Sequence, residues 1–452
     1  MRRFACRLPA LISLAALVWN ASAETRPRYG GTLVVEVHDA MTLRDPGEWP
    51  VALVPLVYET LVRLDEHGEP RPALASAWQH DAEFKRWQFQ IRDGAKFHDG
   101  SPVTAASVAA NFQNWADAAV TANGEKTLVI EMRAPALDLL ARLAAPSSAI
   151  LRRGADAVTS GTGPFRIADW QPGRRALLQA NDDYWGGRPF LDSIDLQMSR
   201  ALRDQSIDLE LGKADVVELS IDDARRESQR GVKTWTSAPS ELLAVVFDPG
   251  RAAVADARVR AAVALSIDRA AIHSVLFERQ GEISGALLPQ WITGYAFLFP
   301  VARDLDRARQ NAAMLPKPAP RLTLAYDGFD PAARPVAERI ALNAREAGVA
   351  IQITPGANAD LHLVRAGLRS ADPAQALADL VAAFHLGELI EPAATTPEAV
   401  YQVEKRAVES FRVVPIVYLP QILGLSPRVR NWEPMRWGNW HLDNVWLQAR
   451  TP

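Results

Sequence analysis

The sequence is almost free of cysteine. Cys6 is the only one among 452 residues, and it lies before the first apolar run of the chain. A chain with no other cysteine forms no internal disulfide, and it has no thiol or thiolate to serve a catalytic or metal site beyond Cys6 itself. Stability must then come from an apolar core, which 48% hydrophobic residues can supply.

Signatures of familiar catalytic sites are also missing. There is no G-x-S-x-G nucleophile elbow and no H-E-x-x-H zinc site, and the eight histidines are scattered. Gly161-Thr162-Gly163-Pro164 lacks the lysine of a phosphate-binding loop, and we interpret it as a turn that enters a strand. His98-Asp99 lies in a Phe-His-Asp-Gly turn, which favours a structural role. We therefore expect no enzyme activity, no metal and no cofactor.

A surplus of either charge is absent as well. The formal net charge is −3, with no clustered basic face such as nucleic-acid binding needs. Beyond the amino terminus, no stretch approaches the roughly 18 apolar residues of a membrane helix. Nucleic acid is therefore not an expected partner.

The amino terminus has the three parts of a secretory signal peptide. Arg2, Arg3 and Arg7 form a positive region, residues 8–19 are apolar, and Ala21-Ser22-Ala23 offers a small-x-small cleavage site. A lipid-anchored protein would carry a cysteine behind the apolar run, which this chain lacks. We expect residues 1–23 to be removed and the protein to reside in the periplasm without a lipid anchor.

The pattern of apolar residues predicts a mixed α/β fold. Alternating or β-branched runs predict strands at 31–37, 87–92, 127–132, 165–169, 176–180, 193–197, 321–326 and 349–353. Helical spacing predicts helices at 51–64, 105–116, 256–277 and 331–347. The strand–helix–strand order at 321–353 is typical of a βαβ unit, so at least one α/β lobe is expected.

Three ordered blocks carry a resemblance to a known family. Residues 87–108 hold the pattern F-x-I-R-D-G-x-K-F-H-D-G-x-P-x-T-A-x-x-V, residues 161–187 hold Gly-Thr-Gly-Pro-Phe followed by Tyr-Trp-Gly-Gly, and residues 256–272 form the third block. Together they resemble the family 5 extracellular solute-binding proteins, which include the oligopeptide, dipeptide and nickel binders of ABC importers. Ser107 stands where the family usually has an aspartate. The match is clear over residues 29–289 and weak beyond.

The resemblance implies a two-lobe binding-protein fold. The main domain of the first lobe is expected to comprise residues 24–49, 159–246 and 422–452, with a subdomain of residues 50–158 inserted in it. The second lobe is expected to span residues 247–421, with a hinge near Val246 and Ile422.

The resemblance also implies a function. We expect a monomer that captures a small solute, peptide or peptide-like, by closing its lobes and delivers it to the membrane permease of an ABC importer. Two other classes stay open, a periplasmic hydrolase on the same shell and a sensor or accessory protein without transport. The ligand itself is not specified, because oligopeptides, dipeptides, opine-like anions, oligosaccharides and metal chelates are all carried by relatives.

Several residues are candidates for ligand contact. His38, Asp39 and Asp45 follow the first strand, where the family has a cleft loop, although His38 and Asp39 suit a simple loop cap equally well. Tryptophan is common both in hydrophobic cores and in binding sites. The tryptophans that we consider as candidates for ligand contact are Trp49, Trp437 and Trp440.

The most informative departure from the family lies in the second lobe. Peptide-binding relatives hold the ligand's α-amino group with an aspartate shortly before an Asp-Pro or Glu-Pro pair. Aligning on Asp372-Pro373 places Arg369 at that position, so an acceptor for ammonium becomes a donor for anions. The alternative is a shift of the alignment by a few residues, which would leave Arg369 on the surface.

Overall fold

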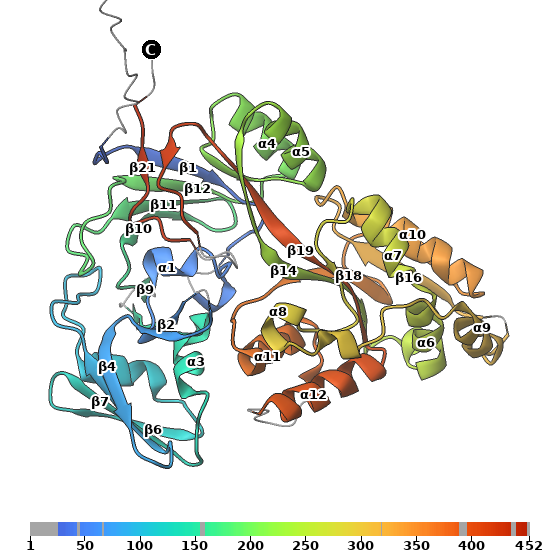
Figure 1. The fold of residues 1–452 in the computed structure, drawn as a ribbon, viewed down its shortest axis with the longest axis horizontal. Helices are drawn as coiled ribbons and strands as arrows, with labels where there is room; N and C mark the ends of the chain where they lie inside the picture. Colours follow the sequence, from blue (N-terminus) through green and yellow to red (C-terminus); the bar gives the residue numbers. More distant parts are fainter. Residues whose placement is uncertain are drawn as a thin grey trace, which may run out of the picture.

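The computed structural model describes residues 26–42, 46–65, 67–153, 159–317, 319–387, 396–434 and 440–449. Its chain forms two lobes, and the long strands β14 and β19 run between them (Figure 1). None of the helices in these ranges is long and apolar enough to cross a membrane. The expected signal peptide lies outside the described residues.

One mixed sheet passes through both lobes. Its strands, in spatial order, are β10 (Phe165–Gln171), β11 (Arg175–Ala180), β12 (Ser193–Gln197), β1 (Thr32–Glu36), β13 (Val216–Glu218), β19 (Val413–Leu425), β14 (Lys233–Phe247), β18 (Leu361–Gly367), β16 (Arg321–Tyr326) and β17 (Ala350–Pro355), with β15 (Glu282–Ile283) paired to β19. β1 is parallel to β12 and β13, and β16 is parallel to β17 and β18, whereas β14 and β19 are antiparallel.

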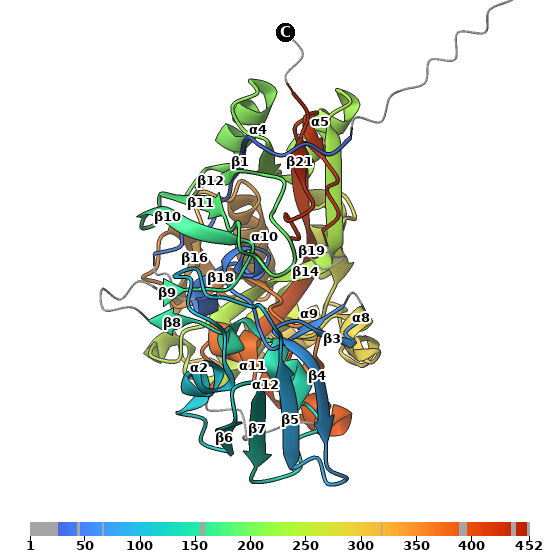
Figure 2. The same cartoon turned by 90° about the vertical axis from the view of Figure 1, so that its left-hand side faces the viewer.

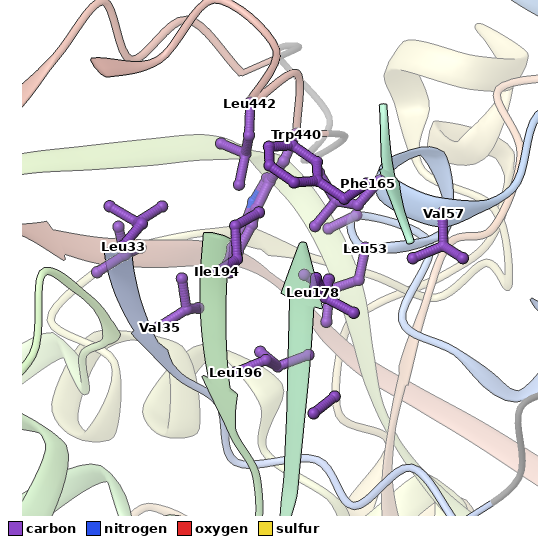
Figure 3. Packing of buried hydrophobic residues seen from close by; sticks show 14 of the residues in the cluster. Leu33, Val35, Leu53, Val57, Phe165, Leu178, Ile194, Leu196, Trp440 and Leu442 are labelled. Atoms are coloured by element: carbon purple, nitrogen blue, oxygen red, sulfur yellow. The ribbon is translucent and has the colours of Figure 1, made fainter. Parts of the chain in front are cut away.

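The core of the first lobe packs on the strands around β1. Leu33, Val35, Ile194 and Leu196 have no more than 1% of their surface exposed, and Figure 3 shows them together with Trp440. Their spacing of two along β1 and β12 puts them on one face of the sheet. The other face is covered by helices α4 (Leu202–Glu210) and α5 (Ile221–Gln229).

A separate four-stranded antiparallel sheet lies within the segment expected as an insertion. Its strands are β4 (Ala75–His80), β5 (Arg86–Ile91), β7 (Thr127–Met132) and β6 (Ala118–Asn123), in that order (Figure 2). Helices α2 (Ala105–Ala109) and α3 (Leu139–Ala144) pack on it. Thr104 caps α2, and Ser107 closes a capping box with it, so the serine that replaces the family's aspartate performs the reciprocal cap.

The inserted part is joined tightly to the main domain. The Gly161–Pro164 turn leads into β10, as expected, and a Cβ on Gly161 or Gly163 would overlap the backbone of Val57. The close approach therefore needs glycine. His98 is part of the same junction, since its Nε2 lies 3.0 Å from the Gly163 carbonyl oxygen. Burial lowers the pKa of His98 to about 4.

The second lobe has helices on both faces of its strands. One face carries α6 (Ala257–Ser266), α9 (Leu305–Ala313) and α10 (Ala333–Glu346), and the other carries α11 (Pro373–Ala383) and α12 (Pro397–Glu409). The unit β16–α10–β17 is the βαβ unit that the sequence predicted.

The remaining elements are short. They are η1 (Pro46–Glu48), α1 (Val54–Val57), β2 (Val62–Leu64), β3 (Pro70–Pro72), η2 (Ala110–Phe112), η3 (Pro146–Ser148), β8 (Arg152–Arg153), β9 (Thr159–Ser160), η4 (Ala252–Val254), α7 (Arg269–Ala271), η5 (Ile272–Leu276), α8 (Gln290–Thr293), η6 (Ala296–Leu298), β20 (Val429–Arg430) and β21 (Trp446–Leu447).

Three predicted helices were wrong in extent. The helix predicted at 105–116 consists of α2 and η2 and ends at Phe112. Residues 51–64 contain only the four-residue α1 and then β2, because the strand pairs with β3 and overrides the helical spacing. The predicted helix 256–277 breaks after Ser266, where Asp268 caps a new turn and the buried Arg269 donates to the Pro415 carbonyl at 2.7 Å. Tertiary bonds of this kind are not visible in local spacing.

The passage from one lobe to the other falls within β14 and β19. Residues 233–236 of β14 pair with the part of β19 that also pairs with β13, whereas residues 241–247 of β14 pair with β18. The register between β14 and β19 shifts on both sides of Pro239. Val246 belongs to the same buried cluster of the second lobe as Leu287 and Leu380. No turn marks the passage, since the strand is continuous.

Candidate functional site

A cavity of about 500 Å³ lies between the lobes. The first lobe contributes residues that follow β1 and β13, and the second contributes the facing parts of β14 and β18 and the loop after β16. The residues used below are His38, Asp39, Glu218, Glu241, Asp327, Asp330, Arg365 and Arg369. Concave sites with a few fixed polar groups are typical of small-ligand binding.

Most charged side chains in this cleft are carboxylates. Arg365 on β18 is neutralised by two of them, because its Nη2 lies 3.1 Å from Asp330 Oδ2 and its Nη1 lies 3.6 Å from Glu241 Oε2. Its positive charge is therefore paired with carboxylates of the cleft wall. The wall as a whole favours a positively charged group on a ligand.

Glu218 is a partly buried carboxylate of the cleft with two hydrogen-bond donors. It accepts the backbone N–H of His38 at 2.6 Å and the Gln421 amide at 3.4 Å. Burial, with a contribution from the neighbouring Asp39, raises the pKa of Glu218 to about 7. Its charge is thus sensitive to pH near neutrality.

His38 reaches across the cleft. Its Nε2 lies 3.0 Å from Oδ2 of Asp327, which follows β16 in the second lobe. Burial opposes a charge on the ring, but the hydrogen bond with Asp327 and the charges of Asp327, Glu218 and Asp39 raise the pKa of His38. Asp39 itself is exposed and lines the cavity.

A second, smaller cavity of about 140 Å³ adjoins the cleft. It is enclosed by α1 and the following strands, the end of α3, the Tyr184-Trp185 turn and residues 440–443, with Arg369 and Ser370 from the second lobe. Val51 and Arg369 line both cavities, so the two spaces meet there.

The first-lobe wall of the small cavity is held by Glu59. Its carboxylate accepts the Tyr184 hydroxyl at 3.1 Å and the Trp185 indole N–H at 3.0 Å. The guanidinium of Arg92 lies 4.0 Å above the Trp185 ring. Burial nevertheless raises the pKa of Glu59 to about 7. These bonds tie α1 to the Tyr184-Trp185 turn.

Arg369 lies just after β18, where the two cavities meet. Its Nη2 lies 3.5 Å from the Pro46 carbonyl oxygen in the first lobe, and no carboxylate of the described residues lies within ion-pair distance. Burial lowers the pKa of Arg369, and Asp379 partly opposes this shift. Among the residues that the structure describes, Arg369 is thus a half-buried cation with a single weak acceptor.

The other predicted residues have different surroundings. Asp372 caps α11 by accepting the Gln375 N–H at 2.9 Å and lines neither cavity. Trp49 has no exposed surface and stacks on Trp170 in the core, with ring centroids 5.6 Å apart. Trp440 is 1% exposed and lines the small cavity. Asp45 and Trp437 lie outside the described residues.

Sequence reasoning missed most of the charged cleft. Glu218, Glu241 and Arg365 were not named, although a charged residue within an otherwise apolar strand is a usable signal. Asp327 and Asp330 follow the predicted strand 321–326, and acidic residues just beyond the carboxyl end of a strand are also a usable signal of a binding site. Within the described residues, no group of three or more His, Cys, Asp or Glu side chains is placed to hold a metal ion.

Two lobes around a polar cleft are the architecture of a solute-binding protein. Comparison with known proteins gives the same class. Residues 69–377 match the family described as "Bacterial extracellular solute-binding proteins, family 5 Middle". The chain belongs to this family of solute-binding proteins, which confirms the resemblance seen in the sequence.

Two relatives from Escherichia coli K12 illustrate the family. The "Probable D,D-dipeptide-binding periplasmic protein DdpA" is 23% identical over 350 residues, which cover 70% of this chain and 67% of the relative. The "Nickel-binding periplasmic protein" is 25% identical over 379 residues, which cover 70% and 72%.

Solved structures confirm the two-lobe fold. Oligopeptide-binding AppA from Bacillus subtilis, in complex with a nonapeptide, superposes with a TM-score of 0.79 at 17% identity, over 94% of this chain and all of that one. AgaA of A. tumefacien R10, in complex with agropinic acid, gives a TM-score of 0.76 at 20% identity, over 93% and 99%. At these identities the likeness establishes the fold alone.

Proposed function

We propose that this protein captures a small peptide-like solute that carries a carboxylate, and that Arg369 binds this carboxylate. The observation that carries the proposal is the position of Arg369. It lines both cavities, and among the described residues its guanidinium has only the weak Pro46 contact, so a carboxylate would supply charge-assisted hydrogen bonds.

The acidic cleft wall supports a second feature of the solute. A free amino group that extends from the carboxylate into the larger cavity would meet Asp39 and Glu218. A zwitterionic solute would therefore satisfy both regions at once. Relatives named as dipeptide-binding and a structural neighbour holding agropinic acid are compatible with a solute of this kind.

Capture would proceed by closure of the lobes. We place the hinge at the irregular pairing around Pro239 and Pro420, where the register of β14 and β19 shifts. A bulged pair of strands bends more easily than a regular ladder. Closure on the solute would shift the protein towards its closed form and present that form to the permease of an ABC importer, with the protein acting as a monomer in the periplasm.

Mass spectrometry of the solute released from protein purified out of the periplasm tests the proposal first. A small molecule with a carboxylate is expected. Titration calorimetry with that molecule should then show at least a tenfold loss of affinity for Arg369→Ala, with partial recovery in Arg369→Lys. Arg307→Ala, on the exposed face of α9, is the matched control.

The proposal fails if the released solute has no anionic group or if Arg369→Ala binds as tightly as the natural protein. We propose no chemical step. A labelled solute should be recovered unchanged after prolonged incubation, and its cleavage would favour the hydrolase alternative.

A further inference from the structure

One hydrogen bond across the cleft joins His38 to Asp327. His38 follows β1 in the first lobe and Asp327 follows β16 in the second, and their side chains meet at 3.0 Å. The bond joins loops about 290 residues apart in sequence. It forms only when the lobes are close together, so it is a contact of the closed arrangement.

The charged groups around His38 are mostly acidic, with Arg365 of β18 as the cation among them, and Phe329 faces the ring from the second lobe. Asp39 is its chain neighbour, Glu218 on β13 binds its backbone N–H, Glu241 lies on β14, and Asp327 faces it from the other lobe. The ring nitrogen Nδ1 is buried and has no hydrogen-bond partner among the described residues. A proton on this nitrogen makes the ring a cation among carboxylates.

We propose that the His38–Asp327 contact is a pH-dependent latch that favours the closed arrangement as the pH falls. This inference uses the two lobes and their facing side chains, and it does not depend on which solute is bound. Histidine suits such a latch because its charge changes within the physiological pH range.

The direction follows from linkage. In the closed form burial lowers the pKa of His38, but the hydrogen bond with Asp327 and the neighbouring carboxylates outweigh burial and raise this pKa above its ordinary value, whereas lobe opening removes Asp327. The closed form therefore binds the proton more tightly than the open form. Its extra stability is complete below the open-form pKa and disappears as the pH rises through the higher closed-form pKa.

The expected effect is modest because the pair is partly exposed. The side chains of His38 and Asp327 retain 27% and 49% of their surface. Pairs of this exposure shift an equilibrium by about two- to fivefold. The closed-to-open ratio should thus fall by about that factor between pH 6 and pH 8.

Distance measurement between the lobes tests the latch without any solute. Spin labels at Asn123→Cys and Gln310→Cys, both exposed and on different lobes, report closure in the full mature chain, where Cys6 is expected to be absent. The solute is removed by partial unfolding and refolding. His38→Gln and Asp327→Asn should each abolish the pH response, and the double variant should add nothing further.

Two controls separate the latch from other titrating groups. His80→Gln changes an exposed histidine of the inserted sheet and should leave the response intact. Glu218→Gln removes the neighbouring acid that titrates near neutrality and should leave most of the response. A pH response that survives in His38→Gln, or its absence in the natural protein, overturns the inference, and solute affinity remains a separate measurement.

Discussion

Glu59 and Arg369 face the same small cavity from opposite lobes, but their side chains differ in how many hydrogen bonds they make to described residues. Glu59 is surrounded by neutral donors from Tyr184 and Trp185, which satisfy its carboxylate. Arg369 has one carbonyl contact at 3.5 Å. Burying a charge is costly unless it is paired and hydrogen-bonded.

The difference distinguishes architecture from function. The bonds of Glu59 connect α1 with the Tyr184-Trp185 turn, so its role is complete within the first lobe. No described residue accepts from the remaining N–H donors of Arg369, which lies where the two cavities meet, and this is the arrangement expected of a ligand-binding group.

The largest effect should come from Glu59. Glu59→Ala leaves the Tyr184 hydroxyl and the Trp185 N–H without their acceptor, and we expect the free energy of unfolding to fall by about 2 kcal/mol. Urea unfolding followed by tryptophan fluorescence measures this. Glu83→Ala, an exposed acid in the same lobe, is the control. Equal stability of both variants would remove the architectural role of Glu59.

Filling the small cavity should affect binding alone. Ala144 lies at the end of α3 and lines this cavity, so Ala144→Leu takes space from a solute. The affinity for the released solute should fall by about tenfold, in line with the cost of overpacking. Ala141→Leu, on the same helix and away from the cavity, should bind normally. Unchanged affinity in Ala144→Leu would mean that the solute occupies only the larger cavity.

Arg369 should contribute little to stability. Because no carboxylate in the described ranges pairs with its charge, Arg369→Ala should change the free energy of unfolding of the solute-free protein by less than about 1 kcal/mol. The same urea series used for Glu59→Ala gives the value. If the free energy of unfolding fell as much in Arg369→Ala as in Glu59→Ala, both side chains would stabilise the fold, and Arg369 would not be reserved for a ligand.

The last prediction concerns the pH dependence of stability. The folded state raises the pKa of Glu59 to about 7 from 4.5, so it binds the proton more tightly than the unfolded state. The contribution of Glu59 to stability therefore declines as the pH rises from about 4.5 to about 7. Glu59→Gln should flatten the curve between pH 5 and pH 7.5, while Glu36, Glu218 and Glu404 keep part of the slope. Parallel curves for the two proteins would contradict this.

The sequence predicted the parts of the fold that depend on short patterns. Strand 193–197 was placed correctly from alternation, and the helix predicted at 105–116 begins at Ala105, directly after the Thr104 cap. The break after Ser266 was missed, since it depends on the bond between Arg269 and the distant Pro415.

The candidate site was predictable only in part. Arg369 was proposed as a ligand-binding residue from its position in the sequence, three residues before Asp372-Pro373, and it lines both cavities. Asp372 was named by the same alignment but caps α11. Trp49 was named for its residue type, and its side chain is enclosed by the core. Residue type and spacing cannot distinguish a tryptophan in a pocket from one in the core.

The sequence by itself determined the family, the mixed α/β class and the local geometry of turns such as Gly161–Pro164, because these follow from neighbouring residues. Only the tertiary structure decided which charges meet. Glu241 and Arg365 lie more than a hundred residues apart and become partners through the pairing of β14 with β18. The contact of His38 with Asp327 exists because two separate lobes approach each other, and no local pattern records that distance.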